Sequence, residues 1–552
     1  MAAVVNEIRD TPEKNGGEGS VEAYKESEIE MPDVHNVGEK MRQASDAYKH
    51  FAGIEAQPLK MEIILWYIYG LCSYFIHTVL LPIVFPLIIS QMVSLPPPPE
   101  QGWTQSSKGM YCRGQELQLY EALVHGSITV NNLKFSPLVW VSISWAAGIF
   151  LCSPILAGLA FQLDHGHNQS LIAGAATIIG ALFCLPTGFF KSVWLFVLYT
   201  AFIVAASTVA AAVHTRHLGL MIRGFTGPTV IRQHFSRRCS IASWLSLYGT
   251  AVGTVGAAII AAFTYHMLHH KEKLVSLWVV SIFSGLKWMV GASHAFTGNR
   301  PGPNPEKEVA RWGHAFAIFK YPHAAGSAVG ILFSSFGASC IFTGGVLYVA
   351  GELCIKPVLV LFLWLAYFFF PLFSLPLLHP LQLLIRADAL RMMFFGSLIS
   401  ALTSGAGFFF RRSNWPKSYL ILAAVFQGTA ACVLHAFGRV LMLDCSPPGR
   451  EGSFSIWFVW VKAIGTCAGF TVASAYAGNV GRSFGIAFLS IVAGVVLMIF
   501  GNISNLGGAV AAGHVTEAAS EKGSPAQGWD NSSEWRGSVH AVVKEDGRAS
   551  HV

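Results

Sequence analysis

The stretch from Ile63 to Pro99 reads IILWYIYGLCSYFIHTVLLPIVFPLIISQMVSLPPPP and contains no Asp, Glu, Lys or Arg. A helix that crosses a bilayer needs about 20 apolar residues, because each residue advances only about 1.5 Å along the axis. This run therefore predicts a transmembrane helix. The whole chain has the same character, since 53% of its 552 residues are hydrophobic and only 12% are charged, against roughly 25% charged residues in soluble proteins.

Further apolar runs, bounded by charged residues or by Pro and Gly, follow along the chain. Counting the first, they lie at about 63–92, 137–163, 169–189, 192–213, 240–265, 274–295, 324–350, 357–385, 392–410, 418–442, 454–478 and 483–504. A long break rich in Pro and Glu, residues 296–323, separates the sixth run from the seventh. The pattern predicts an all-α polytopic membrane protein of about twelve transmembrane helices in two six-helix halves.

The same pattern predicts how the chain is divided. We expect a hydrophilic, disordered N-terminal tail at 1–61, a first bundle at 62–295, a central loop at 296–323, a second bundle at 324–505 and a hydrophilic tail at 506–552. Residues 1–61 lack the apolar core of a signal peptide. An even number of helices places both termini on one side of the membrane.

The formal net charge of +7 does not indicate a nucleic-acid partner, because Lys and Arg are scattered between the apolar runs rather than gathered in one basic stripe. We interpret them as charges that flank membrane helices. One dense group favours cytoplasmic termini: Arg216, Arg223, Arg232, Arg237 and Arg238. Cys112 and Cys354 both fall on the opposite side, where a disulfide between them is compatible with the topology although no spacing requires it.

The fifth runs of the two halves share a pattern in which a basic, serine-containing loop leads through a Trp into a glycine-rich helix. The first reads RCSIASW from Arg238 to Trp244, and the second reads REGSFSIW from Arg450 to Trp457. The glycines that follow are Gly249, Gly253 and Gly256 in the first half, and Gly465 and Gly469 in the second. The match predicts an internal parallel repeat, as in some secondary transporters. Small residues four apart also allow close helix packing.

Twelve predicted spans, a long central loop and the segment from Cys445 to Gly469 resemble the major facilitator superfamily, and within it the vacuole-effluxer branch. The resemblance implies transport by alternating access, with amino acids released from vacuoles as the cargo of that branch. The superfamily's loop between its second and third helices carries an Asp, basic residues and glycines. This chain keeps Asp164 and Gly166 but lacks the basic residues.

The paired loops are predicted to act as gates or hinges on the side of the termini. The residues concerned are Asp164, Gly166, Arg238, Ser240, Arg450, Glu451 and Ser453.

Ionisable residues within the apolar runs are the candidates for substrate binding, because a charge at the bilayer centre costs about 2.5–3.5 kcal/mol on insertion scales. Every candidate is a cation or can become one: His77, Lys287, His435, Arg439 and Lys462. Lys462 lies about nine residues into its run, or about 14 Å deep. We therefore expect Lys462 to hold the anionic group of a substrate.

The other candidate substrate contacts are His77, Tyr74, Arg439 and Trp457. His77 is also the candidate proton-coupling site, since histidine titrates near neutral pH, although a histidine used only in packing is the alternative. For Arg439 we also expect that it reaches the membrane interface or pairs with Asp444, one turn further on.

Three alternatives remain open: a receptor or scaffold that keeps the fold without transport, a metal-ion carrier, and a membrane oxidoreductase with histidine boxes. The last rests on His266, His269 and His270 with the pairs at 165–167 and 214–217, but these fall on opposite sides of the predicted topology, whereas a shared metal site needs them together. We expect no enzyme activity, no cofactor and no bound metal.

The sequence therefore predicts a secondary transporter of a small organic solute, an amino acid or an organic anion, in the vacuolar or plasma membrane. The expected partners are the solute, membrane lipid and, as a candidate coupling ion, the proton.

Overall fold

The computed structural model describes residues 56–516, apart from 96, 99–104, 107–110, 191, 228, 269–272, 298–299, 301, 303–310 and 412–414. The predicted N-terminal tail lies almost wholly outside this part of the chain, as does most of the C-terminal one.

Twelve helices in the described residues are long and apolar enough to cross a membrane. We number them as spans 1 to 12. The first half contains span 1 (α2 Lys60–Ser73, η1 Ile76–Val84 and α3 Phe85–Ser90), span 2 (α5 Pro137–His165), span 3 (α6 Gln169–Cys184 and η2 Leu185–Gly188), span 4 (α7 Val193–Thr226), span 5 (η3 Arg232–His234 and α8 Phe235–Leu268) and span 6 (α9 Lys273–Val290 and η4 Gly291–Phe296).

The second half repeats the count. It contains span 7 (α11 Pro322–Leu347 and η6 Tyr348–Glu352), span 8 (α12 Pro357–Phe369 and α13 Pro371–Leu384), span 9 (α14 Ala389–Phe409), span 10 (α15 Lys417–Asp444), span 11 (α16 Glu451–Ala475) and span 12 (α17 Val480–Phe500). The predicted fold class, an all-α polytopic membrane protein of about twelve transmembrane helices, is confirmed.

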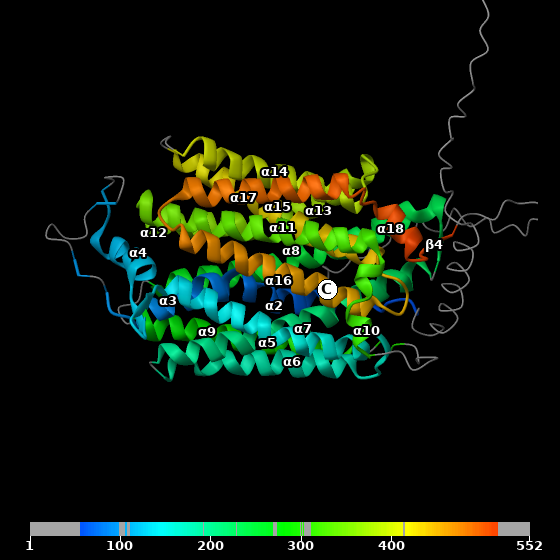
Figure 1. Cartoon of the computed structure of the whole chain (residues 1–552), viewed down its shortest axis with the longest axis horizontal. Helices are drawn as coiled ribbons and strands as arrows, with labels where there is room; N and C mark the ends of the chain where they lie inside the picture. The colour runs from blue at the N-terminus through cyan, green and yellow to red at the C-terminus, as the bar shows by residue number, and fades with distance from the viewer. Residues whose placement is uncertain are drawn as a thin grey trace, which may run out of the picture.

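The spans run side by side along the long axis of the molecule, with α14, α17 and α11 above and α5, α6 and α9 below in Figure 1. One end carries α18 (Asn505–Ala511) and β4 (Val515–Thr516), close to the described C-terminal end of the chain. We call this end the terminal face and the opposite end, where α4 (Gly114–His125) lies, the far face.

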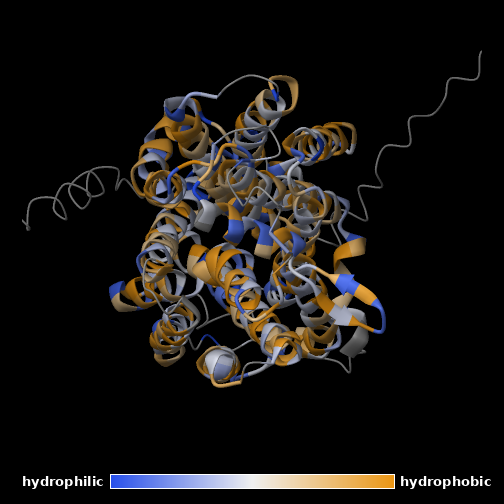
Figure 2. Cartoon of the chain, turned by 90° about the vertical axis from the view of Figure 1, so that its left-hand side faces the viewer, coloured by the Kyte–Doolittle hydropathy of each residue, from blue (hydrophilic) through white to orange (hydrophobic). Residues whose placement is uncertain are grey.

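Large apolar side chains cover the outside of the bundle. Figure 2, a view along the helices, shows hydrophobic residues around its periphery. Exposed examples come from both halves: Phe150, Leu171, Leu182, Leu377, Leu402 and Leu489. In water such a surface would be unstable, so it fits a hydrocarbon solvent.

The two halves meet along two seams. Span 2 packs on span 11, and span 5 packs on spans 8 and 10. Within each half the glycine-rich helix packs closely on the first helix of that half: a Cβ on Gly256 would meet the backbone of Leu71 in span 1, and one on Gly469 would meet the backbone of Phe336 in span 7. The same contact thus occurs in both halves, as a parallel repeat requires.

Spans 4 and 5 are longer than hydropathy predicted. The sequence places Arg216 and Arg223 in a loop, but α7 continues through both to Thr226, and both side chains are buried. The predicted helix ended before Arg216 because a buried arginine needs polar partners, and the partners of Arg216 and Arg223 lie far away in the sequence.

The beginning of the predicted C-terminal tail is folded rather than extended. Residues 505–511 form α18, which Ser504 caps by accepting a hydrogen bond from the Gly507 amide. Beyond it, β4 pairs in parallel with β3 (Val230–Ile231), between spans 4 and 5. Asn505 and Ala509 are buried, so this short segment belongs to the terminal face.

The far face carries α4, a small hairpin of β1 (Ile128–Val130) and β2 (Leu133–Phe135), and one disulfide. The disulfide joins Cys112, between spans 1 and 2, to Cys354, between spans 7 and 8. It therefore links the two halves covalently at this face.

Candidate functional site

A cavity of about 180 Å³ lies between the two halves. Residues of spans 1, 4 and 5 line it from the first half, and residues of spans 7, 8, 10 and 11 line it from the second. We call it the central cavity. Its ionisable lining includes His77, His214, His435, Arg439 and Lys462, with no Asp or Glu among the lining residues.

Lys462, the predicted contact for an anionic group, lines this cavity from span 11. Its ammonium group lies 3.0 Å from Nδ1 of His435, to which it donates a hydrogen bond, and 5.7 Å from the centre of the Tyr74 ring. Tyr74, another predicted contact, lines the same cavity and lies with its hydroxyl 3.8 Å from Sγ of Cys432. The Lys462 charge therefore meets an imidazole and an aromatic ring rather than a carboxylate.

Arg439 also lines the cavity, but the expected pairing with Asp444 is wrong. Its Nε and Nη2 donate to the hydroxyl of Ser246 in span 5 at 3.1 and 2.9 Å, and Nη2 also donates to the Ser246 carbonyl at 3.1 Å. The guanidinium lies 5.0 Å from the centre of the Trp66 ring. Asp444 is one turn further toward the terminal face and is paired with Arg238 instead. Helical spacing alone could not choose between these partners.

His77 lies where span 1 changes its winding. The segment Ile76–Val84 is π-helical and contains Pro82, which has no amide hydrogen to donate to the helix. Short π-helical segments inside α-helices are frequent at functional sites. His77 Nε2 lies 2.9 Å from the Ser207 hydroxyl of span 4, and its Nδ1 has no hydrogen-bond partner within the described residues. This second nitrogen is thus available in the cavity wall.

A series of histidines extends from the cavity toward the terminal face. Sequence reasoning named two of them, His214 and His217, only as a candidate histidine box and did not connect them to the cavity. His214 lines the cavity, stacks on Trp66 at 4.3 Å between ring centres and exchanges two hydrogen bonds with its backbone and indole. The ring of His294 lies 5.5 Å from His214 and 5.0 Å from His217, and His217 Nε2 lies 2.7 Å from Glu62. The spacing of His214 and His217 places them one helical turn apart, which was the available signal.

Asp164, predicted as a gate residue, joins the two halves at the terminal face. Its carboxylate accepts hydrogen bonds from the Ser453 amide at 3.0 Å and the Ser453 hydroxyl at 2.6 Å, at the beginning of span 11. Nδ1 of His314, in α10 (Arg311–Ala315) of the central loop, lies 3.2 Å from the same carboxylate. Close by, the carbonyl of Gly166 accepts from the Gly302 amide at 3.0 Å.

Two buried ion pairs cross between the halves at the same face. Arg223 of span 4 pairs with Glu451 at the beginning of span 11. Arg238 of span 5 pairs with Asp444 at the end of span 10, with 3.1 Å between Nε and Oδ1. The predicted loop residues thus do come together, although they were assigned to loops and lie in helices.

The remaining predicted loop residues make backbone contacts in this region. The Ser240 carbonyl lies 3.3 Å from Nε2 of His379 in span 8. The Arg450 carbonyl accepts from the Ser453 hydroxyl at 3.1 Å.

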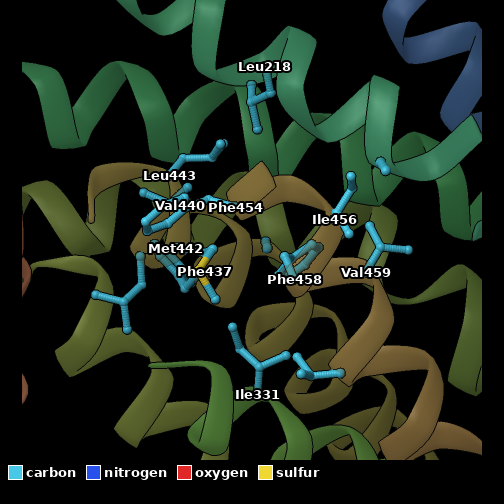
Figure 3. Close-up of a cluster of buried hydrophobic side chains, with 14 of the residues drawn as sticks. Leu218, Ile331, Phe437, Val440, Met442, Leu443, Phe454, Ile456, Phe458 and Val459 are labelled. Atoms are coloured by element: carbon cyan, nitrogen blue, oxygen red, sulfur yellow. The ribbon is translucent and has the colours of Figure 1, made fainter. Parts of the chain in front are cut away.

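An apolar layer lies beside these polar links. Figure 3 shows Leu218 of span 4 pointing toward Leu443 and Val440 of span 10, with Phe454 of span 11 close by. All four are buried in one hydrophobic cluster that draws on both halves. Together with the ion pairs, this layer lies between the central cavity and the terminal face.

Trp457, predicted to contact substrate, lies in this region and is absent from the lining of the central cavity. Its indole Nε1 donates to the carbonyl of Ala315 at 2.5 Å, and its ring meets that of Phe319. It holds the central loop against span 11.

Of the proposed histidine boxes, His269 and His270 lie outside the described residues. His266 is near the far-face end of span 5, whereas His165 and His217 are near the terminal face. The described part of the chain contains no group of three or more His, Cys, Asp or Glu arranged to hold a metal ion.

No protein-family model matches the chain, and no curated protein matches it in sequence. Among solved structures, a crystal structure of a mutant of the nucleoside transporter NupG is similar over 81% of this chain and 99% of that one, with 10% identity and a TM-score of 0.47. A likeness this distant carries no argument about substrate or residues. The vacuole-effluxer branch therefore stays a prediction.

Proposed function

We propose that the protein is a secondary transporter of a small organic anion that binds in the central cavity and crosses by alternating access. The observation that carries this proposal is the chemistry of the cavity, which holds Lys462, Arg439 and three histidines without an acidic lining residue. Cationic side chains at mid-membrane depth are costly unless other groups compensate their charge, and a bound anion would do so. Their location at the seam between two six-helix halves is where secondary transporters bind substrate.

The lining also bears on the choice between an organic anion and an amino acid. A carboxylate can accept hydrogen bonds from Lys462, while the ammonium group of an amino acid would find no carboxylate among the lining residues. Hydroxyls of Ser334, Ser335 and Ser339 in span 7 offer neutral partners. We therefore place an organic acid without an amino group first and an amino acid second.

The disulfide supports cytoplasmic termini. Disulfides persist in oxidising compartments and are rare in the cytosol. Cys112 and Cys354 lie at the far face, so the far face would be extracellular or luminal and the terminal face cytoplasmic. This agrees with the bias expected from the arginines of spans 4 and 5.

Proton coupling is proposed through His77, with the series from His214 to Glu62 as a second group of candidates. His77 is in the cavity wall with one nitrogen unpartnered among the described residues. If His77 carries the coupled proton, His77→Gln should abolish the pH dependence of uptake. If the pH dependence of uptake is unchanged in His77→Gln, His77 does not carry the coupled proton. The candidates would then be His214, His294 and His217, or transport is not coupled to protons.

Uptake into proteoliposomes tests the function. Purified protein is offered labelled organic acids and amino acids, with and without a pH gradient, beside Lys462→Gln. Lys287→Gln is the matched control, because Lys287 is also within the membrane but donates to the Gly256 carbonyl at 2.7 Å and does not line the cavity.

Saturable uptake of an anion, lost in Lys462→Gln and kept in Lys287→Gln, would support the proposal. Uptake that survives Lys462→Gln would contradict the anion site. No uptake of any compound by folded protein would favour the receptor or scaffold alternative.

A further inference from the structure

A second cavity, of about 510 Å³, lies within the second half, between spans 7, 8, 9, 10 and 12. We call it the lateral cavity. It is in the part of the membrane nearer the far face, because it takes residues from the ends of spans 7 and 9 and from the beginnings of spans 8, 10 and 12. Its rim includes side chains exposed on the outside of the bundle, such as Leu402 at 65% and Tyr419 at 59%. The lateral cavity therefore opens toward lipid.

Two polar side chains in its wall have unsatisfied hydrogen-bonding atoms. Gln427 of span 10 is 2% exposed, and neither its amide nitrogen nor its amide oxygen has a partner in the described structure. Trp364 of span 8 is 6% exposed, and its indole Nε1 is likewise unpartnered there. A buried polar group left without a partner destabilises the folded protein, because it has lost its hydrogen bonds to water. A ligand that supplies these partners would recover that stability.

The chemistry of the wall defines what the ligand offers. The other polar groups of the wall are neutral hydroxyls and one further indole, from Tyr348, Tyr367, Thr403, Trp415 and Tyr419. The wall includes no Asp, Glu, Lys, Arg or His, so a charged headgroup would be left unpaired. A hydroxyl group both donates and accepts, and so can satisfy the oxygen of Gln427 together with its nitrogen or the indole of Trp364. The ligand is therefore neutral and carries a hydroxyl.

The volume of the lateral cavity and the depth of Gln427 in the membrane restrict the class of ligand further. The volume is within the roughly 300–1,000 Å³ range of pockets that hold compact, drug-sized ligands. Gln427 is ten residues into span 10 from Lys417, and hence about 15 Å from the far-face end of that helix. The hydroxyl must reach the middle of the membrane, which a phospholipid headgroup cannot do without leaving the interface.

We propose that the lateral cavity is a binding site for a sterol, a neutral lipid with a rigid apolar body and one hydroxyl, which enters from the bilayer with the hydroxyl leading toward Gln427 and Trp364. The ring system fills the apolar space. Gln427 and Trp364 form hydrogen bonds with the hydroxyl at a depth where lipid tails offer no hydrogen-bonding partner.

The lateral cavity shares a wall with the central cavity. Phe342 of span 7 and Tyr367 of span 8 line both, and their ring centres lie 4.7 Å apart. A sterol in place would support this aromatic wall from the lipid side. Because the two cavities are neighbours, the apolar part of a transported anion is an alternative occupant of the lateral cavity. The test must distinguish this anion from a sterol.

The test uses photolabelling, which does not depend on transport. The full chain is reconstituted in phosphatidylcholine bilayers with cholesterol that carries a diazirine on its alkyl chain, and labelled peptides are mapped by mass spectrometry. We expect saturable labelling of spans 8, 9 and 10, competed by cholesterol but not by its 3-O-methyl ether, which cannot donate a hydrogen bond.

Two variants test the polar contacts. Loss of one hydrogen bond, about 0.5–1.5 kcal/mol, corresponds to about two- to tenfold weaker binding, so Gln427→Leu and Trp364→Phe should each raise the half-saturating probe concentration by that factor. The matched control is Trp194→Phe, an exposed tryptophan of span 4 in the first half, which should leave labelling unchanged. Cholesterol should also raise the melting temperature of the unmodified protein more than that of Gln427→Leu.

Three results would overturn the proposal. The first is labelling outside these spans, and the second is equal competition by cholesterol and its methyl ether in the unmodified protein. The third is displacement of the probe by a transported anion, which would make the lateral cavity part of the substrate path. The methyl ether comparison remains decisive if either variant fails to fold, because it changes only the ligand.

Discussion

Arg223 near the end of span 4 is paired with Glu451 at the beginning of span 11, so a buried ion pair joins the two halves at the terminal face. Removing one member of a buried pair costs about 3–5 kcal/mol, because the other charge is left without a partner. Glu451→Gln should therefore lower the melting temperature and open the terminal face. Labelling of Ser335→Cys in the central cavity by a membrane-impermeant maleimide added at that face should become faster.

The charge swap Arg223→Glu with Glu451→Arg is the control for this pair. If the pair holds the face closed, the double variant should recover part of the stability and slow the labelling. Labelling at the same rate in the single variant and the unmodified protein would show that the pair does not control access.

Arg439 makes contacts that lysine cannot reproduce. Its guanidinium reaches the hydroxyl and the carbonyl of Ser246 while lying over Trp66, whereas an ammonium group is a point charge without the planar fork. Arg439→Lys should cost about 1.5–3 kcal/mol, as for a hydrogen bond to a charged group. Thermal unfolding of Arg439→Lys, Ser246→Ala and the double variant measures this, and additive losses would mean that the two side chains do not interact.

The disulfide between Cys112 and Cys354 closes a sequence separation of 242 residues. Loss of such a bond typically costs about 2–5 kcal/mol, so Cys112→Ser should lower the melting temperature, and Cys112→Ser with Cys354→Ser should lower it by no more. A membrane-impermeant reductant should act only from the far face. Reduction from the terminal face alone would reverse the proposed orientation.

Substitution of Gly249 tests the close packing of span 5 on span 1, and substitution of Gly158 in span 2 provides a control. A Cβ at Gly249 would collide with the ring of Trp66, which is fixed by its hydrogen bond to the His214 carbonyl and cannot move aside cheaply. Gly249→Ala should therefore destabilise the protein. At Gly158 an added Cβ would meet no atom within 4 Å, so Gly158→Ala is the control and should leave the melting temperature unchanged or raise it. Equal effects would contradict tight packing at Gly249.

Acid should loosen the folded C-terminal segment through His514. Burial holds the pKa of His514 well below its usual value, with Arg238 and Arg223 acting in the same direction. Because the folded pKa is depressed, this histidine contributes full stability above the unfolded pKa of about 6.5, and the contribution declines as the pH falls below it. Limited proteolysis after residue 505 should be faster at pH 5 than at pH 7.5, and His514→Gln should reduce that difference. An unchanged difference in the variant would assign the acid effect to other groups.

The hydrophobic runs were sufficient to predict twelve helices, because lipid exposure imposes one apolar pattern on every span. They could not predict where spans 4 and 5 end, since Arg216 and Arg223 are buried by contacts with residues more than 80 positions away, Arg300 and Glu451. Charged and aromatic residues stand out in an apolar helix, which is why the sequence singled out four residues that line the central cavity: Lys462, His77, Tyr74 and Arg439.

Other parts of the site carried no such signal. His214 lies just beyond the predicted end of span 4, where a histidine does not stand out in composition, and only the fold brings it to Trp66 and His294. Gln427 and Trp364 are uncharged and were not singled out, because an unsatisfied hydrogen bond is a property of three-dimensional surroundings rather than of sequence.

The disulfide fastens the segment that carries α4 to the second half, although α4 lies between spans 1 and 2 in the sequence. Cys354 lies two residues after the end of span 7 and three before the beginning of span 8, so it is held firmly by the second half. Cys112 is separated by more than 20 residues from each of its neighbouring spans, and Gly351 in η6 packs against the ring of Tyr120 in α4. Because α4 also packs on α3 and α5 of the first half, it touches both halves, and the disulfide is a fixed point that any relative movement of the halves at the far face would have to preserve.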